Sequence, residues 1–230
     1  MLELPPVNVR LLADALKAFL AEELRASGLA GYLVGLSGGV DSAVSAALAV
    51  AAVGPERVSA LALPGPTSSP ESLRDARSVA DALGLRLEVL DLARPGEVLV
   101  ETLGARADRI RFGNMMARLR MVALFDRARP VPALVLGTSN KSEILLGYST
   151  LFGDAAASVQ PLGDVWKTHV FALARALGVP NAVVAKPPTA DLWPGQTDAG
   201  ELGFDYETVD PVLYWHHEGG MEREREPGGH

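Results

Sequence analysis

The sequence of 230 residues contains no cysteine. This absence excludes disulfide bonds, thiolate nucleophiles and zinc sites with thiolate ligands. A basic excess is missing too, because 28 acidic residues outnumber 21 Lys and Arg residues and give a net charge of −7. Proteins that bind nucleic-acid phosphates are usually basic, so the charge argues against a nucleic-acid partner.

Long hydrophobic segments are also missing. The longest largely apolar run, at 43–53, is rich in alanine and too short to span a bilayer. The N-terminal residues 1–9 do not place a basic stretch before an apolar one, as a signal peptide does. We therefore expect a cytoplasmic protein that does not act at a membrane.

Apolar residues recur with two periods along the chain, one typical of helices and one of buried strands. Strands are expected at 32–36, 58–63, 85–90 and 133–137. Helices are expected from Asn8 to Gly28 and at 41–53, 70–83, 105–127 and 164–177. Strands that alternate with amphipathic helices form βαβ units. The sequence therefore predicts an α/β fold with a doubly wound, mostly parallel sheet and helices on both faces, as in Rossmann-like proteins.

Residues 1–220 are expected to form a single domain of this kind. Within it, the stretch 186–203 is rich in Pro, Gly, Asp and Thr and has no periodicity. Such long loops are typical of lids or of disordered segments. The last residues, 221–230, alternate Glu and Arg and end in Pro-Gly-Gly-His, so we expect a disordered tail.

A glycine-rich turn follows the first expected strand. Two adjacent glycines let backbone N–H groups point inward as an anion nest, and the next helix adds its positive N-terminal end. An isolated Gly-Gly pair would indicate no more than a tight turn, but the whole string between a strand and a helix favours phosphate binding. The string consists of Gly35, Leu36, Ser37, Gly38, Gly39, Val40, Asp41 and Ser42.

Two acidic residues are candidates for a metal site. The carboxylate of Asp41 would repel phosphates unless Mg²⁺ lay between them, although Asp41 could also cap the following helix. In a doubly wound sheet the first and fourth strands are neighbours, which would bring Glu143 towards Asp41. Alternatively, Glu143 could serve as the capping partner of Asn140. Together the two carboxylates predict one Mg²⁺ site.

The glycine-rich string differs from the common nucleotide-binding loop. That loop requires a Lys directly before a Ser or Thr, and no Lys occurs between Lys17 and Lys141. The string instead resembles the pyrophosphate loop of the ATP pyrophosphatase (PP-loop) superfamily. This resemblance implies an adenine nucleotide alpha hydrolase-like fold and cleavage of ATP between its α and β phosphates.

Further motifs narrow the resemblance to NAD synthetases. The similar segments are 113–121 (GNMMARLRM), 137–143 (GTSNKSE), 161–168 (PLGDVWKT) and 188–198 (PTADLWPGQTD), and the similarity extends from Tyr32 to Val212. The chain is thus similar to ammonia-dependent NAD synthetases. In their reaction, the carboxylate of deamido-NAD is adenylated by ATP, pyrophosphate leaves, and ammonia displaces AMP to form NAD.

The resemblance also implies roles for individual residues. Asp41 and Lys167 would be catalytic, Asp41 and Glu143 would bind Mg²⁺, and Arg118 and Ser158 would contact deamido-NAD. From the residues alone, Lys167 could be a solvated first-turn residue, and Arg118 a surface ion-pair partner. The positions expected to contact ATP are Gly35, Leu36, Ser37, Gly38, Gly39, Val40, Asp41, Ser42, Thr138, Lys167 and Thr189.

Several positions depart from the family pattern. Leu151 stands where ammonia-dependent members have a Lys, Ser158 where they have an Asp, and Met116 where a Lys is common; their C-terminal His-Lys pair has no counterpart. These departures leave open amidation of a different carboxylate, or a nucleotide-binding homologue with reduced catalysis. The resemblance further implies a homodimer. No glutaminase domain is expected before the motif, so nitrogen would come as free ammonia or from a separate ammonia-supplying protein.

Overall fold

The computed structural model describes residues 2–105, 108–193 and 195–219. Its centre is a parallel sheet of four strands in the order β3-β2-β1-β4. The strands are β1 (Gly31–Gly35), β2 (Val58–Ala62), β3 (Leu87–Val89) and β4 (Ala133–Leu136). Val34 of β1 is paired with Ala60 on one side and with Leu136 on the other. The chain thus builds outward from β1 to β3 and returns to the opposite side of β1, which confirms the predicted doubly wound sheet.

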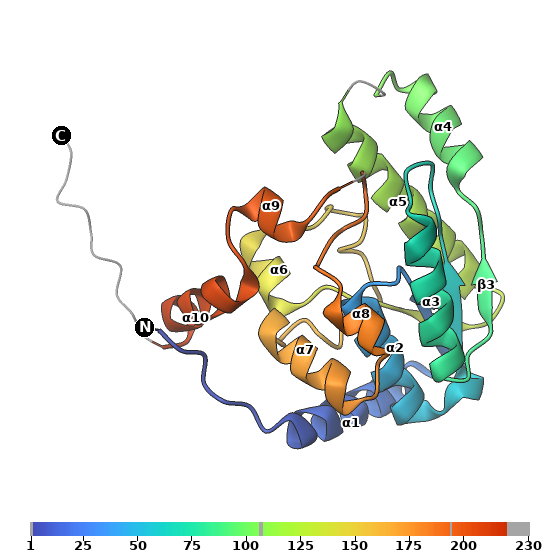
Figure 1. The fold of residues 1–230 in the computed structure, drawn as a ribbon. Coiled ribbons are helices and arrows are strands. Elements are labelled where there is room, and N and C mark those ends of the chain that lie inside the picture. The colour runs from blue at the N-terminus through green and yellow to red at the C-terminus, as the bar shows by residue number, and fades with distance from the viewer. Residues whose placement is uncertain (1, 106–107, 194, 220–230) are drawn as a thin grey trace, which may run out of the picture.

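Helices cover both faces of this sheet. Successive side chains of a strand point to opposite faces, and Tyr32 packs into a core with α1, α2, α3 and α7, whereas Leu33 packs into a core with α5. Figure 1 shows α1, α2 and α7 side by side, while α5 lies away from them. The helices are α1 (Val9–Ser27), α2 (Val40–Val53), η1 (Pro55–Arg57), α3 (Pro70–Ala82), α4 (Ala93–Thr102), α5 (Arg109–Ala128), α6 (Lys141–Leu146), α7 (Lys167–Ala176), α8 (Asn181–Ala185), α9 (Asp198–Leu202) and α10 (Tyr206–His217).

Local sequence signals set the ends of several helices. The side chain of Asn8 accepts a hydrogen bond from the Leu11 N–H and begins α1, and Gly28 ends this helix with a φ of 67°. In α6, Asn140 and Glu143 each accept a hydrogen bond from the other's backbone N–H, which is a capping box. The predicted capping role of Glu143 is therefore present in the structure. None of the helices in the described ranges is long and apolar enough to cross a membrane.

The sequence-based prediction was wrong about several helix boundaries. The helix expected at 105–127 begins only at Arg109, where Asp108 caps it, and a separate helix, α4, precedes it. The helix expected at 164–177 begins at Lys167. Helices α6, α8 and α9 have only five or six residues, too few to show a helical period, and α10 has a proline within it. The expected tail at 221–230 lies outside the described residues.

One polar contact links α1 to the sheet. The hydroxyl of Tyr32 in β1 donates a hydrogen bond of 2.6 Å to the backbone carbonyl of Leu20 in α1, and both side chains are fully buried. Burial raises the pKa of Tyr32 to about 12, so this hydroxyl keeps its proton at neutral pH.

We predict that the substitution Tyr32→Phe lowers the free energy of unfolding by about 1 kcal/mol, because the ring still fills the core while the hydrogen bond to α1 is lost. Urea denaturation at neutral pH, followed by far-UV circular dichroism, measures this difference. Equal stability of the variant and the parent would show that the hydroxyl contributes nothing to the packing of α1.

Candidate active site

A cavity of about 620 Å³ opens at the carboxyl ends of β1 and β4. This is the point where the strand order reverses, and ligands of doubly wound proteins bind there. The cavity walls come from the glycine-rich turn at 35–42, the loop after β4, one side of α5 and the segment 186–193. Its volume lies within the range of small-molecule sites.

The glycine-rich turn forms the floor of the cavity at the N-terminus of α2. Ser37 and Ser42 are linked through their hydroxyls at 3.2 Å, and the Ser37 hydroxyl accepts the Gly39 N–H. Gly38 has a φ of 85°, and a Cβ there would collide with the carbonyl of Ser72, so only glycine fits. Gly39 offers no side-chain cap to α2. The first N–H groups of this helix therefore stay available for an anion.

A buried cation lies beside this turn. The Lys167 ammonium is 2.6 Å from Asp41 Oδ2 and 3.0 Å from Glu143 Oε1, and Lys167 is only 1% exposed. Its Nζ also lies 5.1 Å from the centre of the Tyr206 ring. The alternative interpretation of Lys167 as a solvated first-turn residue is therefore wrong. The two carboxylates predicted to share a metal ion lie close enough together to bind one cation.

Asn140 connects the two acidic residues, and the sequence analysis assigned it no role at the site beyond helix capping. Its side-chain amide donates to Asp41 Oδ1 at 2.9 Å, and its backbone N–H donates to Glu143 Oε2 at 3.2 Å. Asn140 is fully buried. The available sequence signal was an N-cap residue in the short loop after β4, which borders the cavity.

The electrostatics of the site follow from burial and from these short contacts. Burial raises the pKa of Glu143 to about 7, the ammonium of Lys167 opposes this rise, and the nearby carboxylate of Asp41 adds to it. Burial disfavours the charge on Lys167, but the carboxylates of Asp41 and Glu143 outweigh burial and raise its pKa. Lys167 is therefore a permanent cation at neutral pH.

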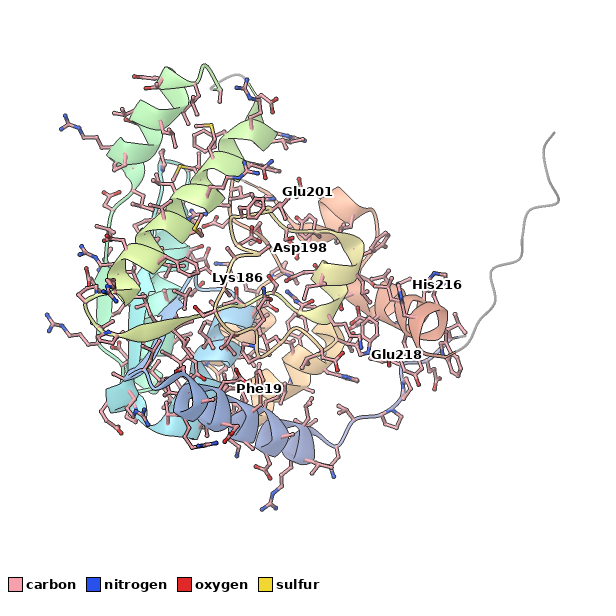
Figure 2. The ribbon with its side chains drawn as sticks, turned by 180° about the vertical axis from the view of Figure 1, so that it is seen from behind. Phe19, Lys186, Asp198, Glu201, His216 and Glu218 are labelled. Carbon is pink, nitrogen blue, oxygen red and sulfur yellow. The ribbon has the colours of Figure 1, made fainter. Side chains whose placement is uncertain are left out.

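A second cluster of polar side chains borders the cavity on the side of α9. Tyr206 donates to Asp198 at 2.9 Å, and Tyr148 donates to Glu201 at 2.5 Å. Gln196 also donates to Glu201, at 2.8 Å. Figure 2 shows Asp198 and Glu201 close together, in the region of α9. The sequence analysis assigned these residues no individual role. Gln196 and Asp198 fall within the family-like motif 188–198, Glu201 lies in the stretch without periodicity, Tyr148 lies in the loop after α6, and Tyr206 begins a helix that was not expected.

The segment 186–203, expected to be a lid or a disordered loop, contains α9 and is tied to the region after β2. Lys186 forms an ion pair of 2.9 Å with Asp75 of α3, and Figure 2 labels this lysine. The hydroxyl of Thr67 donates to the carbonyl of Leu192 at 2.9 Å. The described part of this segment thus forms one wall of the cavity.

Some residues assigned to ligands by the family resemblance line the cavity and others do not. Thr138, Thr189 and the turn residues except Gly38 line it. Arg118 is exposed on α5 and donates to the carbonyl of Leu151, and it forms no ion pair with an acidic residue of the described ranges. Ser158 uses its hydroxyl to accept the Val135 N–H. Neither Arg118 nor Ser158 is among the cavity-lining residues.

A parallel α/β sheet whose first strand runs into a glycine-rich anion-binding turn defines a Rossmann-like nucleotide-binding protein of the PP-loop type. The model of the NAD synthase family matches residues 12–226, and the chain belongs to this family. Its members are ligases that form a carbon–nitrogen bond. The predicted fold class and the predicted family are thereby confirmed.

Named relatives agree with this assignment. The NH(3)-dependent NAD(+) synthetase of Chlorobaculum tepidum is 49% identical over 90% of this chain and 74% of its own length. That of Thermococcus kodakarensis is 42% identical over 90% of this chain and 81% of its own length. Among solved structures, an NMN synthetase from Francisella tularensis is similar with a TM-score of 0.84, 30% identity and coverage of 97% of this chain and 99% of that chain. The NH3-dependent NAD synthetase from Campylobacter jejuni has a TM-score of 0.79 and 29% identity, covering 96% and 90%.

We predict that Lys167→Met lowers the free energy of unfolding by about 3 kcal/mol near pH 8, because the carboxylates of Asp41 and Glu143 then lie close together without a cation. The loss is expected to shrink as the pH falls towards about 6, because removal of the ammonium raises the pKa of Glu143 further above its parental value of about 7, and a protonated Glu143 no longer repels Asp41.

Urea denaturation at both pH values measures the effect. The matched control is Lys17→Met, which removes a surface lysine paired with Asp14 on α1 and should have little effect at either pH. A pH-independent loss in Lys167→Met would contradict the electrostatic explanation.

Proposed function

We propose that this enzyme converts deamido-NAD to NAD by ATP-dependent amidation with ammonia. The observation that carries the proposal is the buried Lys167 held between Asp41 and Glu143, beside an anion-binding turn. Relatives that are 42–49% identical are named NH(3)-dependent NAD(+) synthetase, which supports the same reaction here. A cytoplasmic location is compatible with this reaction.

Asp41 and Glu143 are suited to hold a magnesium ion. Mg²⁺ usually takes one or two carboxylates together with phosphate oxygens, and these two side chains already reach one common cation, the Lys167 ammonium. Asn140 donates hydrogen bonds to both carboxylates and fixes their orientation. When bound, Mg²⁺ would neutralise negative charge on the ATP phosphates.

The remaining residues of the ATP site bind and orient the phosphates. The turn at 35–42 and the N-terminus of α2 provide N–H donors for the pyrophosphate portion of ATP. Thr138 and Thr189 contribute hydroxyls at the cavity wall. Lys167 stabilises the charge that builds up as the bond between the α-phosphorus and pyrophosphate breaks.

The reaction proceeds in two steps, the first at the α-phosphorus of ATP and the second at the carboxyl carbon of the nicotinate group. A carboxylate oxygen of the nicotinate group attacks the α-phosphorus of ATP, and pyrophosphate leaves. Ammonia then attacks the carboxyl carbon, AMP leaves, and the amide forms. Since the adenylate is sensitive to hydrolysis, the wall formed by the segment 186–203, which is linked to α3 through Lys186 and Asp75, serves to keep water out.

In a single chain, the end of the site that would hold the dinucleotide has fewer of the expected contact residues in place than the ATP side has. Arg118 lies outside the cavity, and the Ser158 hydroxyl already accepts a backbone N–H. In our proposal Arg118 contacts the part of deamido-NAD that extends from the cavity. The same proposal includes a homodimer, in which a second copy of the chain covers that end of the site. It also includes a separate ammonia-supplying protein. Both rest on the family resemblance.

A second candidate is amidation of a smaller acid, nicotinate mononucleotide, to NMN. Leu151, at the position where related enzymes have a Lys, is 66% exposed and offers no charge to a second phosphate. The similarity to the NMN synthetase structure also favours this second candidate. The two candidates share the ATP site and differ only in the carboxylate substrate.

The decisive assay measures pyrophosphate release and the amide product from purified protein with ATP, Mg²⁺ and ammonium. We expect NAD to form when deamido-NAD is supplied, and we expect Asp41→Ala to lower the rate at least about 100-fold because it loses a group that stabilises the transition state. Turnover of nicotinate mononucleotide alone would favour the second candidate. If neither acid gave pyrophosphate release or an amide product, amidation of both substrates would be refuted.

We also predict that Mg²⁺-dependent binding of a non-hydrolysable ATP analogue strengthens as the pH rises from about 6 to about 8. Glu143 has its pKa raised to about 7 by burial, so below this pH the metal ion must displace a proton from it. Isothermal titration calorimetry measures the affinity. The variant Glu143→Gln should keep only the pH dependence of the nucleotide itself, and an identical pH profile in parent and variant would contradict the role of Glu143.

A further inference from the structure

Helix α10 contains a fully buried carboxylate, that of Asp210, which is 0% exposed. Asp210 Oδ1 accepts a hydrogen bond of 2.6 Å from the Ser142 hydroxyl. Asp210 Oδ2 accepts the Thr168 N–H at 2.9 Å and the Thr168 hydroxyl at 2.6 Å. Asp210 is not among the described residues that line the cavity. A buried carboxylate of this kind is costly unless it is satisfied, and here three donors satisfy it.

These contacts reach the two segments that carry the charged centre of the site. Ser142 directly precedes Glu143 in α6, and Thr168 directly follows Lys167 in α7. The Ser142 hydroxyl also accepts the Lys167 N–H at 2.9 Å. The carboxylate of Asp210 therefore joins the first turn of α6 to the first turn of α7 at the positions next to the two reactive side chains.

The N-terminus of α7 depends on this arrangement. Trp166, at the N-cap position, provides no side-chain hydrogen bond to the helix. The first N–H groups of a helix have no partner within the helix and need one from elsewhere. For α7 these partners are the Ser142 hydroxyl for Lys167 and the Asp210 carboxylate for Thr168. A carboxylate at this end of a helix is also favoured by the helix dipole.

A further contact ties α6 to the end of α10. Lys141, the first residue of α6, forms ion pairs with Asp164 and with Glu218, and its ammonium lies 5.0 Å from the ring centre of Trp166. Figure 2 shows Glu218 near the end of α10. Helix α10 thus braces α6 through Lys141 at the surface and through Ser142 in the interior.

We propose that Asp210 is a positioning residue that fixes Lys167 relative to Glu143. The inference rests on the proposed function, in which these two side chains carry the phosphate chemistry. Asp210 touches neither of their charged groups and acts through Ser142 and Thr168. Reactive groups must be held within a fraction of an ångström for efficient catalysis, and a carboxylate bonded to both segments provides that restraint.

The first test compares Asp210→Asn with Asp205→Ala. The asparagine keeps the shape of the side chain but replaces one acceptor oxygen with a donor, so at least one of the three hydrogen bonds is lost. Asp205 caps the same helix by accepting the Thr208 N–H and does not reach α6 or α7 in any contact of the described residues. Its variant therefore reports on loosening of α10 without loss of the hydrogen bonds that Asp210 accepts from Ser142 and Thr168.

We expect Asp210→Asn to lower kcat about 10- to 100-fold, as misplaced reactive groups do, while KM for ATP stays within about threefold because binding through the turn persists. Asp205→Ala should keep kcat within about twofold even when its melting temperature falls as far as that of Asp210→Asn. Equal kcat values for Asp210→Asn and the parent would overturn the proposal. So would equal losses of kcat in both variants at equal loss of stability.

A double-mutant cycle identifies the route of the effect. If Asp210 acts through Lys167, then Asp210→Asn causes little further loss of kcat in a Lys167→Met background. A full further loss in that background would overturn the assignment. Where Asp210→Asn does not fold, Thr168→Val replaces it, because this nearly isosteric change keeps the backbone N–H bond and removes only the hydroxyl donor.

Hydrogen exchange separates the failure of this inference from failure of the proposed function. If the parent makes no amide product, the proposed function fails. The positioning role of Asp210 is still tested by the backbone amide protons of Lys167 and Thr168. These protons should exchange at least about tenfold faster in Asp210→Asn and at the parental rate in Asp205→Ala. Unchanged exchange in Asp210→Asn would overturn the proposal whatever the activity.

Discussion

The structure depends on one buried cation and the two carboxylates that neutralise it. Burying Lys167 is costly in free energy unless acceptors surround it, and Asp41 and Glu143 provide these acceptors from two other helices. The N-termini of α2, α6 and α7 therefore meet at one point, the carboxyl edge of the sheet. The same arrangement that stabilises the charge also places it beside the cavity.

The N-termini of three helices, α2, α6 and α7, form this site. They leave backbone N–H groups without intrahelical partners, and the protein satisfies them in different ways. At α2 the cap is glycine, so the donors stay available for a phosphate. At α6 a capping box uses them, and its Glu143 keeps one carboxylate oxygen for Lys167. At α7 they bond to Ser142 and to Asp210 from distant elements.

The ATP side of the site and the side that would hold the carboxylate substrate differ in how complete they are. The turn, Lys167 and both acidic residues are all in place around the cavity. By contrast, Leu151 is exposed and uncharged, and Arg118 donates a hydrogen bond to a backbone carbonyl. In the proposed function, this difference separates the adenylation step, which is assigned to the rigid charged centre, from the choice of substrate, which is assigned to contacts outside it.

The sequence by itself determined the alternation of strands and helices, the anion-binding turn and the family, because periodicity, capping residues and glycine-rich turns are local properties. It also predicted that Asp41 and Glu143 would approach each other, since the strand order of a doubly wound sheet follows from its connections. The tertiary structure alone decided that Lys167 is buried and that Asn140 and Asp210 support the charged centre. These contacts join residues far apart in the sequence, and the short helices α6 and α9 have too few residues for a pattern to reveal them.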